Sequence, residues 1–478
     1  MNNVNLVYGV KDKPGFWKTI VFALQQVLAI LAATIVVPVI INGNSAENAA
    51  AGIGVASNMS QSAALFGAGV GTIVYLLFTK FRSPVFLGSS FAFLGSMTAA
   101  FAGATSASAG YLGLIVGAVF AGLVYVIIAL VVKFVGVNWI DKLMPAAVIG
   151  PTVAVIGLSL SGNAVGDLTK GYASCSPWIA LLCGLVTLIT VIICSVYGKK
   201  MLKIIPFIIG ILAGYALGAI FTIIGTVADV PELIVINFSL FKDMQWFPEF
   251  TFVEVFEGFG EIKDFGSLLV TVAVAYIPVA FVVFAEHLAD HKNISSIIGT
   301  DLTKDPGLHR TLLGDGVGSM AGAFFGGCPN TTYGESVGCV AISGNASVVT
   351  ILTAAIICML AAFFAPFVTL LATIPSCVMG GVCFALYGFI AVSGLKMVQK
   401  VDLNENGNLF TVSTILIAGV GGLVLNIGKV TLTAVACALI LGIIVNLISK
   451  KGTKKVDCAE GCDGCSEEDV CVKDVNDK

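Results

Sequence analysis

The chain has 478 residues, of which 57% are hydrophobic and only 11% are charged, and its formal net charge is −3. Its mean hydropathy of +0.99 leaves too little polar surface for a water-soluble globule of this length, so a soluble enzyme is excluded. Apolar stretches of roughly 20 residues, the length that crosses a bilayer as a helix, recur through the chain. We therefore expect an all-α polytopic membrane protein with about fourteen transmembrane segments, two of them short and irregular.

The first apolar run, residues 17–41, is much longer than the core of a signal peptide, so it is expected to stay as a span. If both termini lie on one side, the lysine clusters at 199–203 and 450–455 fall on that side too. The positively charged residues on the other side are Lys170, Lys242, Lys263 and Lys429. The positive-inside rule then predicts a multi-pass protein of the cytoplasmic membrane with both termini in the cytoplasm.

Two spans are interrupted by proline, glycine and hydroxyl residues. The third reads SPVFLGSSFAFLGS from Ser83, and the tenth reads CPNTTYGESVGCVA from Cys328. Paired interrupted segments are typical of transporters with inverted repeats, so a seven-plus-seven repeat is predicted. Extended backbone at this depth requires protein or a water-filled cavity to satisfy it, which predicts a substrate cavity. For glycines such as Gly67 and Gly69 of the second span, close helix packing is the simpler interpretation.

Two glutamates stand in this apolar setting: Glu286 ends the run LLVTVAVAYIPVAFVVFAEH, and Glu335 lies in the broken tenth span. A charged side chain at the bilayer centre costs roughly 2.5–3.5 kcal/mol on the insertion scale, so it is retained mainly where it binds a ligand or moves protons. Both residues are therefore candidate site residues.

Asp290 follows Glu286 by four residues and shares its helical face. Two interpretations stay open: it belongs to a proton relay, or it is a solvated helix end beside His291 and Lys292. For His287 a hydrogen-bonded structural role is favoured.

Nine of the thirteen cysteines scatter through or beside apolar runs, where they are expected to be small packing residues. The others lie in a polar, acidic tail: Cys458, Cys462, Cys465 and Cys471. Their spacing only loosely resembles a metal site, so metal or redox binding stays open beside the preferred interpretation, a disordered tail that transport does not need. No cofactor, metal or nucleic-acid partner is predicted for the membrane portion.

At the residues just described, the chain resembles the nucleobase-ascorbate transporter (nucleobase:cation symporter-2) family, and within it the uracil permeases. The resemblance covers residues 15–449 and is sharpest in AEHLADH (285–291), DPGLHRTLLGDG (305–316) and PNTTYGESVG (329–338). SSFAF (89–93) agrees with the third span of the family.

The resemblance implies a core domain that moves past a gate domain as an elevator, in a protein that is commonly a homodimer. It also implies two short antiparallel strands, one each in spans three and ten. The expected divisions are core 1–136 and 266–373, gate 137–228 and 374–449, an extracellular loop at 229–265 with an amphipathic segment, and a cytoplasmic tail at 450–478.

The resemblance places substrate contacts at Glu286, Glu335, Gly334, Tyr333 and Phe91. Proton coupling falls on Glu286, Glu335 and Asp290, since the proton is the coupling ion of such carriers. Gln26, Ser90 and Tyr387 are further candidates to line the cavity.

The expected function is proton-coupled import of uracil. A carboxylate can accept from the N–H groups of the base, backbone N–H groups can donate to its carbonyls, and an aromatic ring can cover its face. A xanthine or urate carrier of the same family is an alternative, although purine carriers usually have glutamine at the position of Glu335. An anion transporter of the related fold is a third alternative, which the two acids disfavour.

Overall fold

The structure is a computed structural model that describes residues 6–136, 138–199, 202, 205–242, 244, 246–262, 265–427 and 430–452. Eight of the described helices are long and apolar enough to cross a membrane, and nine if the helix pair at 348–372, bent by 83°, forms one broken span. The predicted mostly helical, multi-span architecture is therefore confirmed. The tail cysteines Cys458, Cys462, Cys465 and Cys471 lie outside the described residues.

The helices follow one another with short connections. In chain order they are α1 (Phe16–Ala50), α2 (Gln61–Phe78), α3 (Leu94–Ala102), α4 (Ala107–Val135), α5 (Asn138–Leu143), α6 (Ala146–Ser159), α7 (Ser161–Asp167), α8 (Pro177–Tyr197), α10 (Pro206–Ala228), α11 (Thr251–Glu257), α12 (Phe265–Ile298), α13 (Leu308–Gly326), α14 (Gly334–Ser343), α15 (Val348–Ala361), α16 (Ala365–Ala372), α17 (Ser376–Val398), α18 (Asn406–Val420) and α19 (Ala434–Gly452). Short tight or widened turns are η1 (Phe91–Phe93), η2 (Pro231–Leu233), η3 (Phe238–Lys242), η4 (Phe259–Glu261) and η5 (Thr303–Gly307). The strands are β1 (Leu87–Ser89), β2 (Asn330–Thr332), β3 (Leu425–Ile427) and β4 (Val430–Leu432).

Capping serines and first-turn prolines explain where several helices begin. The Ser60 and Ser106 side chains accept hydrogen bonds from the backbone N–H of Ala63 and Ala109, which caps α2 and α4. Helices α8 and α10 each begin with proline, whose missing N–H costs nothing in a first turn. These residues therefore mark where α2, α4, α8 and α10 begin.

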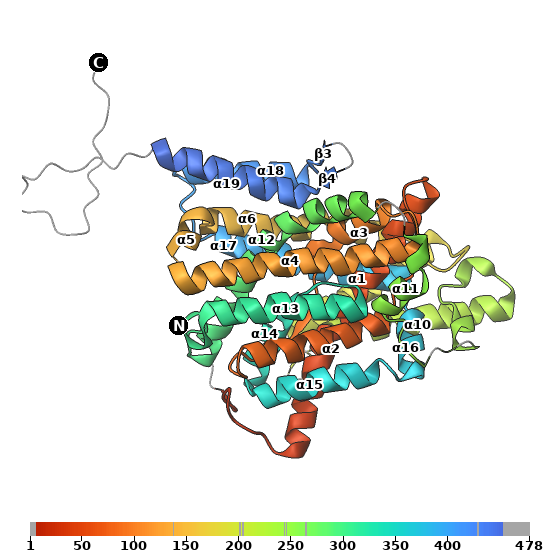
Figure 1. Cartoon of the computed structure of the whole chain (residues 1–478). Coiled ribbons are helices and arrows are strands. Elements are labelled where there is room, and N and C mark those ends of the chain that lie inside the picture. Colours follow the sequence, from red (N-terminus) through yellow and green to blue (C-terminus); the bar gives the residue numbers. More distant parts are fainter. Residues whose placement is uncertain are drawn as a thin grey trace, which may run out of the picture.

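The helices pack in two groups. In the first bundle, α13 lies against α2 and α4, α12 lies against α4, and α15 lies against α1 and α2. In the second bundle, α17 lies against α6 and α8, α10 lies against α8, and α18 lies against α6 and α19. Figure 1 shows α2, α13 and α15 at one edge of the molecule and α18 and α19 at the opposite edge. The division of the chain into core and gate domains stays a prediction, because packing alone does not show which group moves.

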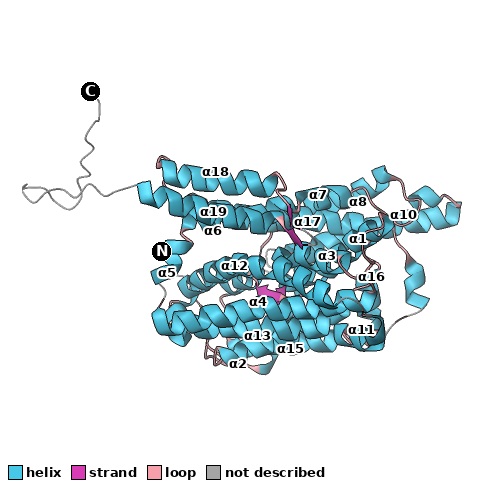
Figure 2. Ribbon diagram, turned by 45° about the horizontal axis from the view of Figure 1, so that its top comes forward, coloured by secondary structure: helices cyan, strands magenta, loops and turns pink. Residues whose placement is uncertain are grey.

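Two interrupted segments meet where β1 pairs with β2 in an antiparallel ladder, with Gly88 opposite Thr331. Backbone hydrogen bonds extend the pairing on both sides, from Ser90 N–H to the Pro329 carbonyl at 2.9 Å and from Tyr333 N–H to the Phe86 carbonyl at 3.1 Å. These bonds satisfy backbone groups that a helix would otherwise pair internally. The two predicted strands in the third and tenth spans are therefore confirmed, and Figure 2 shows them in magenta among the helices.

Glycines on α2 allow α13 to approach closely. A side chain added at Gly67 would meet the backbone of Gly322, and one added at Gly71 would overlap the amide group of Asn330. Asn330 in turn donates to the Gly67 carbonyl at 3.0 Å. The packing interpretation of Gly67 is confirmed, and these glycines fix β2 against the first bundle.

A second short hairpin, β3 paired with β4, connects α18 to α19 and was not predicted.

On the segment before α12, Phe250 packs its ring against Phe66, Phe325 and Phe363, with ring centroids 5.0 to 6.3 Å apart. This contact holds the start of α11 against the first bundle, whereas Phe256 of α11 stays exposed.

Candidate substrate-binding site

A cavity of about 430 Å³ lies beside the crossing strands, with walls from both bundles. Six residues that the sequence places at the site line it: Phe91, Glu286, Asp290, Tyr333, Gly334 and Glu335. They come from η1, α12 and the β2–α14 segment, which are distant in sequence. The β1–β2 ladder is what joins these elements, because it ties the third span to the tenth.

The first turn of α14 points into the cavity. Tyr333 is the residue before the helix, and Gly334 and Glu335 are its first two residues. The backbone N–H groups of a first helical turn have no partner within the helix and carry a partial positive charge. Gly334 has no side chain to cover them. This end of α14 can therefore donate hydrogen bonds to carbonyl oxygens of a ligand.

Glu286 and Asp290 face the cavity from one side of α12. Asp290 is 8% exposed and its Oδ2 accepts a hydrogen bond from the Thr332 hydroxyl at 2.9 Å. The interpretation of Asp290 as a solvated helix end is therefore wrong. Glu335 lines the same cavity as Glu286 and Asp290, so the three carboxyl groups would repel one another if all were ionised.

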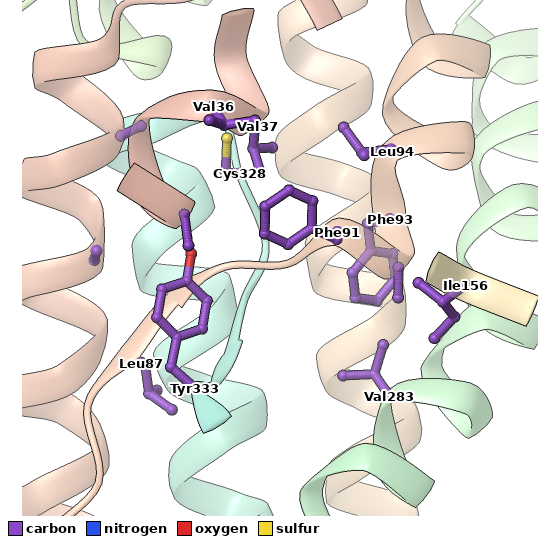
Figure 3. Packing of buried hydrophobic residues seen from close by; sticks show 14 of the residues in the cluster. Val36, Val37, Leu87, Phe91, Phe93, Leu94, Ile156, Val283, Cys328 and Tyr333 are labelled. Carbon is purple, nitrogen blue, oxygen red and sulfur yellow. The ribbon is translucent and has the colours of Figure 1, made fainter. Parts of the chain in front are cut away.

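Aromatic rings flank the crossing. The Tyr333 hydroxyl donates to the Ser89 carbonyl at 2.9 Å, which fixes its ring against β1. Phe91 lies edge-on to Tyr387, with ring centroids 5.7 Å apart and an interplanar angle of 79°. Figure 3 shows Phe91 and Tyr333 at the crossing together with Phe93. Both rings have one side against the cavity, where a flat ligand could stack.

Three further candidates from the sequence do not line this cavity: Gln26, Ser90 and Tyr387. Gln26 donates from Nε2 to the Ser336 hydroxyl at 2.8 Å, and this hydroxyl accepts from the Phe86 N–H at 3.0 Å. Gln26 thus fixes the start of α14 through Ser336 without lining the cavity. Tyr387 is buried and reaches the site only through its contact with Phe91.

A buried polar network lies on the other face of α12. His287 pairs through Nδ1 with Asp315 Oδ2 at 2.6 Å and through Nε2 with the Thr311 hydroxyl at 3.0 Å. His291 Nε2 lies 2.7 Å from the Tyr75 hydroxyl. The structural role of His287 is confirmed, because these bonds join α12 to α13 and fix the rotation that turns Glu286 to the cavity.

The cavity also has polar and aromatic residues that sequence reasoning missed: Ser195, Phe207, Asn293, Phe389 and Ser393. Asn293 follows Glu286 by seven residues, about two helical turns, so its position on the same face was a usable signal. The others lie on α8, α10 and α17, where nothing in the sequence distinguishes them from ordinary residues of a span.

The cavity extends toward one face of the molecule. Ser195 lies two residues before the end of α8, Phe207 is the second residue of α10, and Met397 is the penultimate residue of α17. Lys199 and Lys396 lie beside these positions. We refer to this side as the lysine-rich face. Among the described residues of the second bundle, those that line the cavity lie from the middle of α6 and α17 toward this face.

Comparison with known proteins gives consistent matches over most of the chain. Residues 17–428 match the xanthine/uracil permease model, described as a permease family. The chain is 36% identical over 454 residues to the uracil permease of Bacillus subtilis (strain 168), with 93% of this chain and 95% of that protein covered. It is 35% identical over 447 residues to the uracil permease of Escherichia coli (strain K12), covering 92% and 94%.

Among solved structures, the fold is similar to the transmembrane domain of the cyanobacterial bicarbonate transporter BicA. The TM-score is 0.54 at 17% sequence identity, with 93% of this chain and 100% of that chain covered. At this identity the likeness shows the fold alone.

Proposed function

Because this chain belongs to the xanthine/uracil permease family, and is thus a membrane transporter and not an enzyme, we propose that it imports uracil. Two relatives at 36% and 35% identity, each aligned over more than nine-tenths of the chain, are named uracil permeases. The observation that carries the proposal is a cavity lined together by three carboxyl groups, the start of α14 and the rings of Phe91 and Tyr333.

In this proposal the Glu286 and Glu335 carboxylates accept from ring N–H groups of the base. The N–H groups at Gly334 donate to a carbonyl oxygen, and Phe91 and Tyr333 cover the ring faces. A base with a different edge would leave buried polar groups unpaired, so it would bind much more weakly. Selectivity among bases would then depend on the hydrogen-bond donors and acceptors along the edge of the ring.

We further propose that protons drive the transport. Removal from water favours the neutral form of a carboxyl group, and three carboxyls in one cavity cannot all stay ionised without repulsion. Glu286, Asp290 and Glu335 would together bind one proton along with the base and release it on the opposite side of the membrane. The three carboxyl groups would titrate as a unit.

The architectural part of the proposal is a seven-plus-seven inverted repeat with fourteen segments, arranged as a core and a gate domain and assembled as a homodimer. In support, β1 precedes the half-helix α3 and β2 precedes the half-helix α14, which is the same order in both halves of the chain. The core would move past the gate as an elevator, with both termini and the lysine-rich face in the cytoplasm.

The proposed site is tested by uptake of labelled uracil into energised cells, with and without an uncoupler. Glu286→Gln and Glu335→Gln keep the side-chain shape but remove an acceptor and a titratable group. We expect losses of about 5- to 150-fold, since an unpaired buried group costs about 1–3 kcal/mol. Glu257→Gln, an exposed acid of α11, is the matched control. Full accumulation in both site variants would refute the assignment.

A purine carrier remains the alternative within the family. If the protein takes up labelled xanthine and excess uracil does not inhibit this uptake, a xanthine carrier would replace the proposed uracil carrier. The presence of glutamate at position 335 favours the pyrimidine.

A further inference from the structure

The cavity has a second polar group that the proposed uracil site does not use. Asn293 projects into it from α12, about 10 Å along the helix axis from Glu286 toward the lysine-rich face. Ser195 of α8 and Ser393 of α17 line the cavity from the second bundle, each within five residues of the end of its helix at that face. One amide and two serines thus line the cavity toward the lysine-rich face.

The Ser195 hydroxyl is buried and has no hydrogen-bond partner among the described residues. A buried hydroxyl without a partner is unfavourable, and in native proteins it normally finds protein, water or a ligand. This hydroxyl has almost no accessible surface although Ser195 lines the cavity, so its side chain has to rotate about χ1 before a ligand in the cavity can supply the missing partner.

Aromatic surface accompanies these polar groups. Phe207 and Phe389 both line the cavity, in edge contact, with ring centroids 5.9 Å apart and an interplanar angle of 71°. A volume of about 430 Å³ falls in the range of pockets that enclose drug-sized ligands. A single-ring base at Glu286 and Glu335 therefore leaves the part near Asn293 unfilled.

We propose that Ser195, Asn293 and Ser393 form an exit subsite, which holds the nucleobase between its release from the carboxyl groups and its departure at the lysine-rich face. The amide of Asn293 can donate to a ring carbonyl and accept from a ring N–H, and the hydroxyls can do either. The Phe389 ring supplies apolar contact. The subsite rests on the proposed function, since its ligand is the transported base.

The test compares zero-trans uracil flux from each face, in right-side-out and inside-out membrane vesicles with the proton gradient collapsed. For Asn293→Ala and for the double variant Ser195→Ala/Ser393→Ala, we expect the half-saturating concentration at the lysine-rich face to rise about three- to tenfold. At the other face we expect a change below about twofold, within the effect of a neutral substitution.

The maximal rate from the lysine-rich face should rise in the same proportion. Without a driving gradient, the maximal rate divided by the half-saturating concentration must have the same value for flux from either face of a carrier. Ser413→Ala is the matched control, since this exposed serine of α18 donates to the Leu409 carbonyl of its own helix and bonds to no other helix in the described part of the chain. Equal changes at both faces, or none at either, would overturn the subsite. Absence of uracil flux in the parent protein would instead overturn the proposed function.

Discussion

At the scale of single residues, Gly334 is the position where backbone and ligand would come closest. A Cβ atom built at Gly334 would meet nothing in the protein nearer than Asp290 Oδ1 at 3.8 Å. The protein can therefore accommodate alanine there, and the added methyl group would occupy cavity space in front of the first turn of α14. In the proposed site, glycine would be required at this position by the ligand and not by the packing of the protein.

We expect Gly334→Ala to weaken uracil binding about tenfold, or about 1.4 kcal/mol, because the base can no longer reach the backbone N–H groups. Thermal stability should stay the same or rise, since alanine is the better helix former. Equilibrium binding of labelled uracil to purified protein, with a melting curve of each variant, measures both. Gly266→Ala, at an open position near the start of α12, is the control. Unchanged binding in Gly334→Ala would remove the α14 backbone from the site.

Residues of the site differ in how far the sequence alone could identify them. Glu286 and Glu335 stand out because a buried charge is expensive and therefore rare in a span. Asn293 and Ser195 do not, since an amide or hydroxyl near the end of a span is also what a solvated helix end contains. Only the fold shows that both line the cavity, one from each bundle.

At the scale of elements, the paired strands depend on one close contact. A Cβ atom at Gly88 of β1 would overlap the ring of Tyr333, which the Ser89 carbonyl holds in place through the Tyr333 hydroxyl. The strand and the ring therefore cannot both keep their positions if position 88 carries a side chain.

Gly88→Ala is expected to reduce uracil uptake at least tenfold, about 1.4 kcal/mol, by displacing Tyr333 from the base. In the background Tyr333→Ala, which removes the ring, the same change should add little. Uptake by the parent, both single variants and the double variant forms a cycle that measures this coupling. Additive losses would mean that Gly88 acts on β1 itself and not through the ring.

An element could be predicted from the sequence where its residues depart from what a membrane-spanning helix normally contains. Proline, glycine and hydroxyl residues in apolar surroundings identified the two interrupted spans, because a lipid-exposed helix has no use for them. The strands β1 and β2 within these spans were implied by the family resemblance. Hairpin β3–β4 was missed, since two three-residue strands between α18 and α19 have no distinctive period. The 83° bend between α15 and α16 was missed as well, because apolar composition continues through it.

At the scale of the whole molecule, an ion pair connects the two bundles on the side away from the lysine-rich face. Lys170, in the loop after α7, lies 2.8 Å from Glu47 near the end of α1 and 3.6 Å from Asp167. The side chains of Lys170 and Glu47 are 52% and 68% exposed. The structure thus has its cavity toward the lysine-rich face and an interbundle contact at the other face. With the proposed orientation, this arrangement would be that of an inward-facing carrier.

If the bundles separate on that side during transport, Lys170→Gln should favour the opposite conformation. An exposed ion pair contributes about 0.2–1 kcal/mol, so the ratio of the two conformations should change by about 1.4- to fivefold. Because apparent affinity scales with the fraction of protein in the competent conformation, half-saturation of uracil uptake at that face should fall by up to this factor. Salt should reduce the difference between parent and variant, since it screens exposed charges. Glu47→Gln should reproduce the change, whereas the charge swap Glu47→Lys/Lys170→Glu should restore the parent value. A swap no closer to the parent than the single variants would show that the pair does not hold the bundles together.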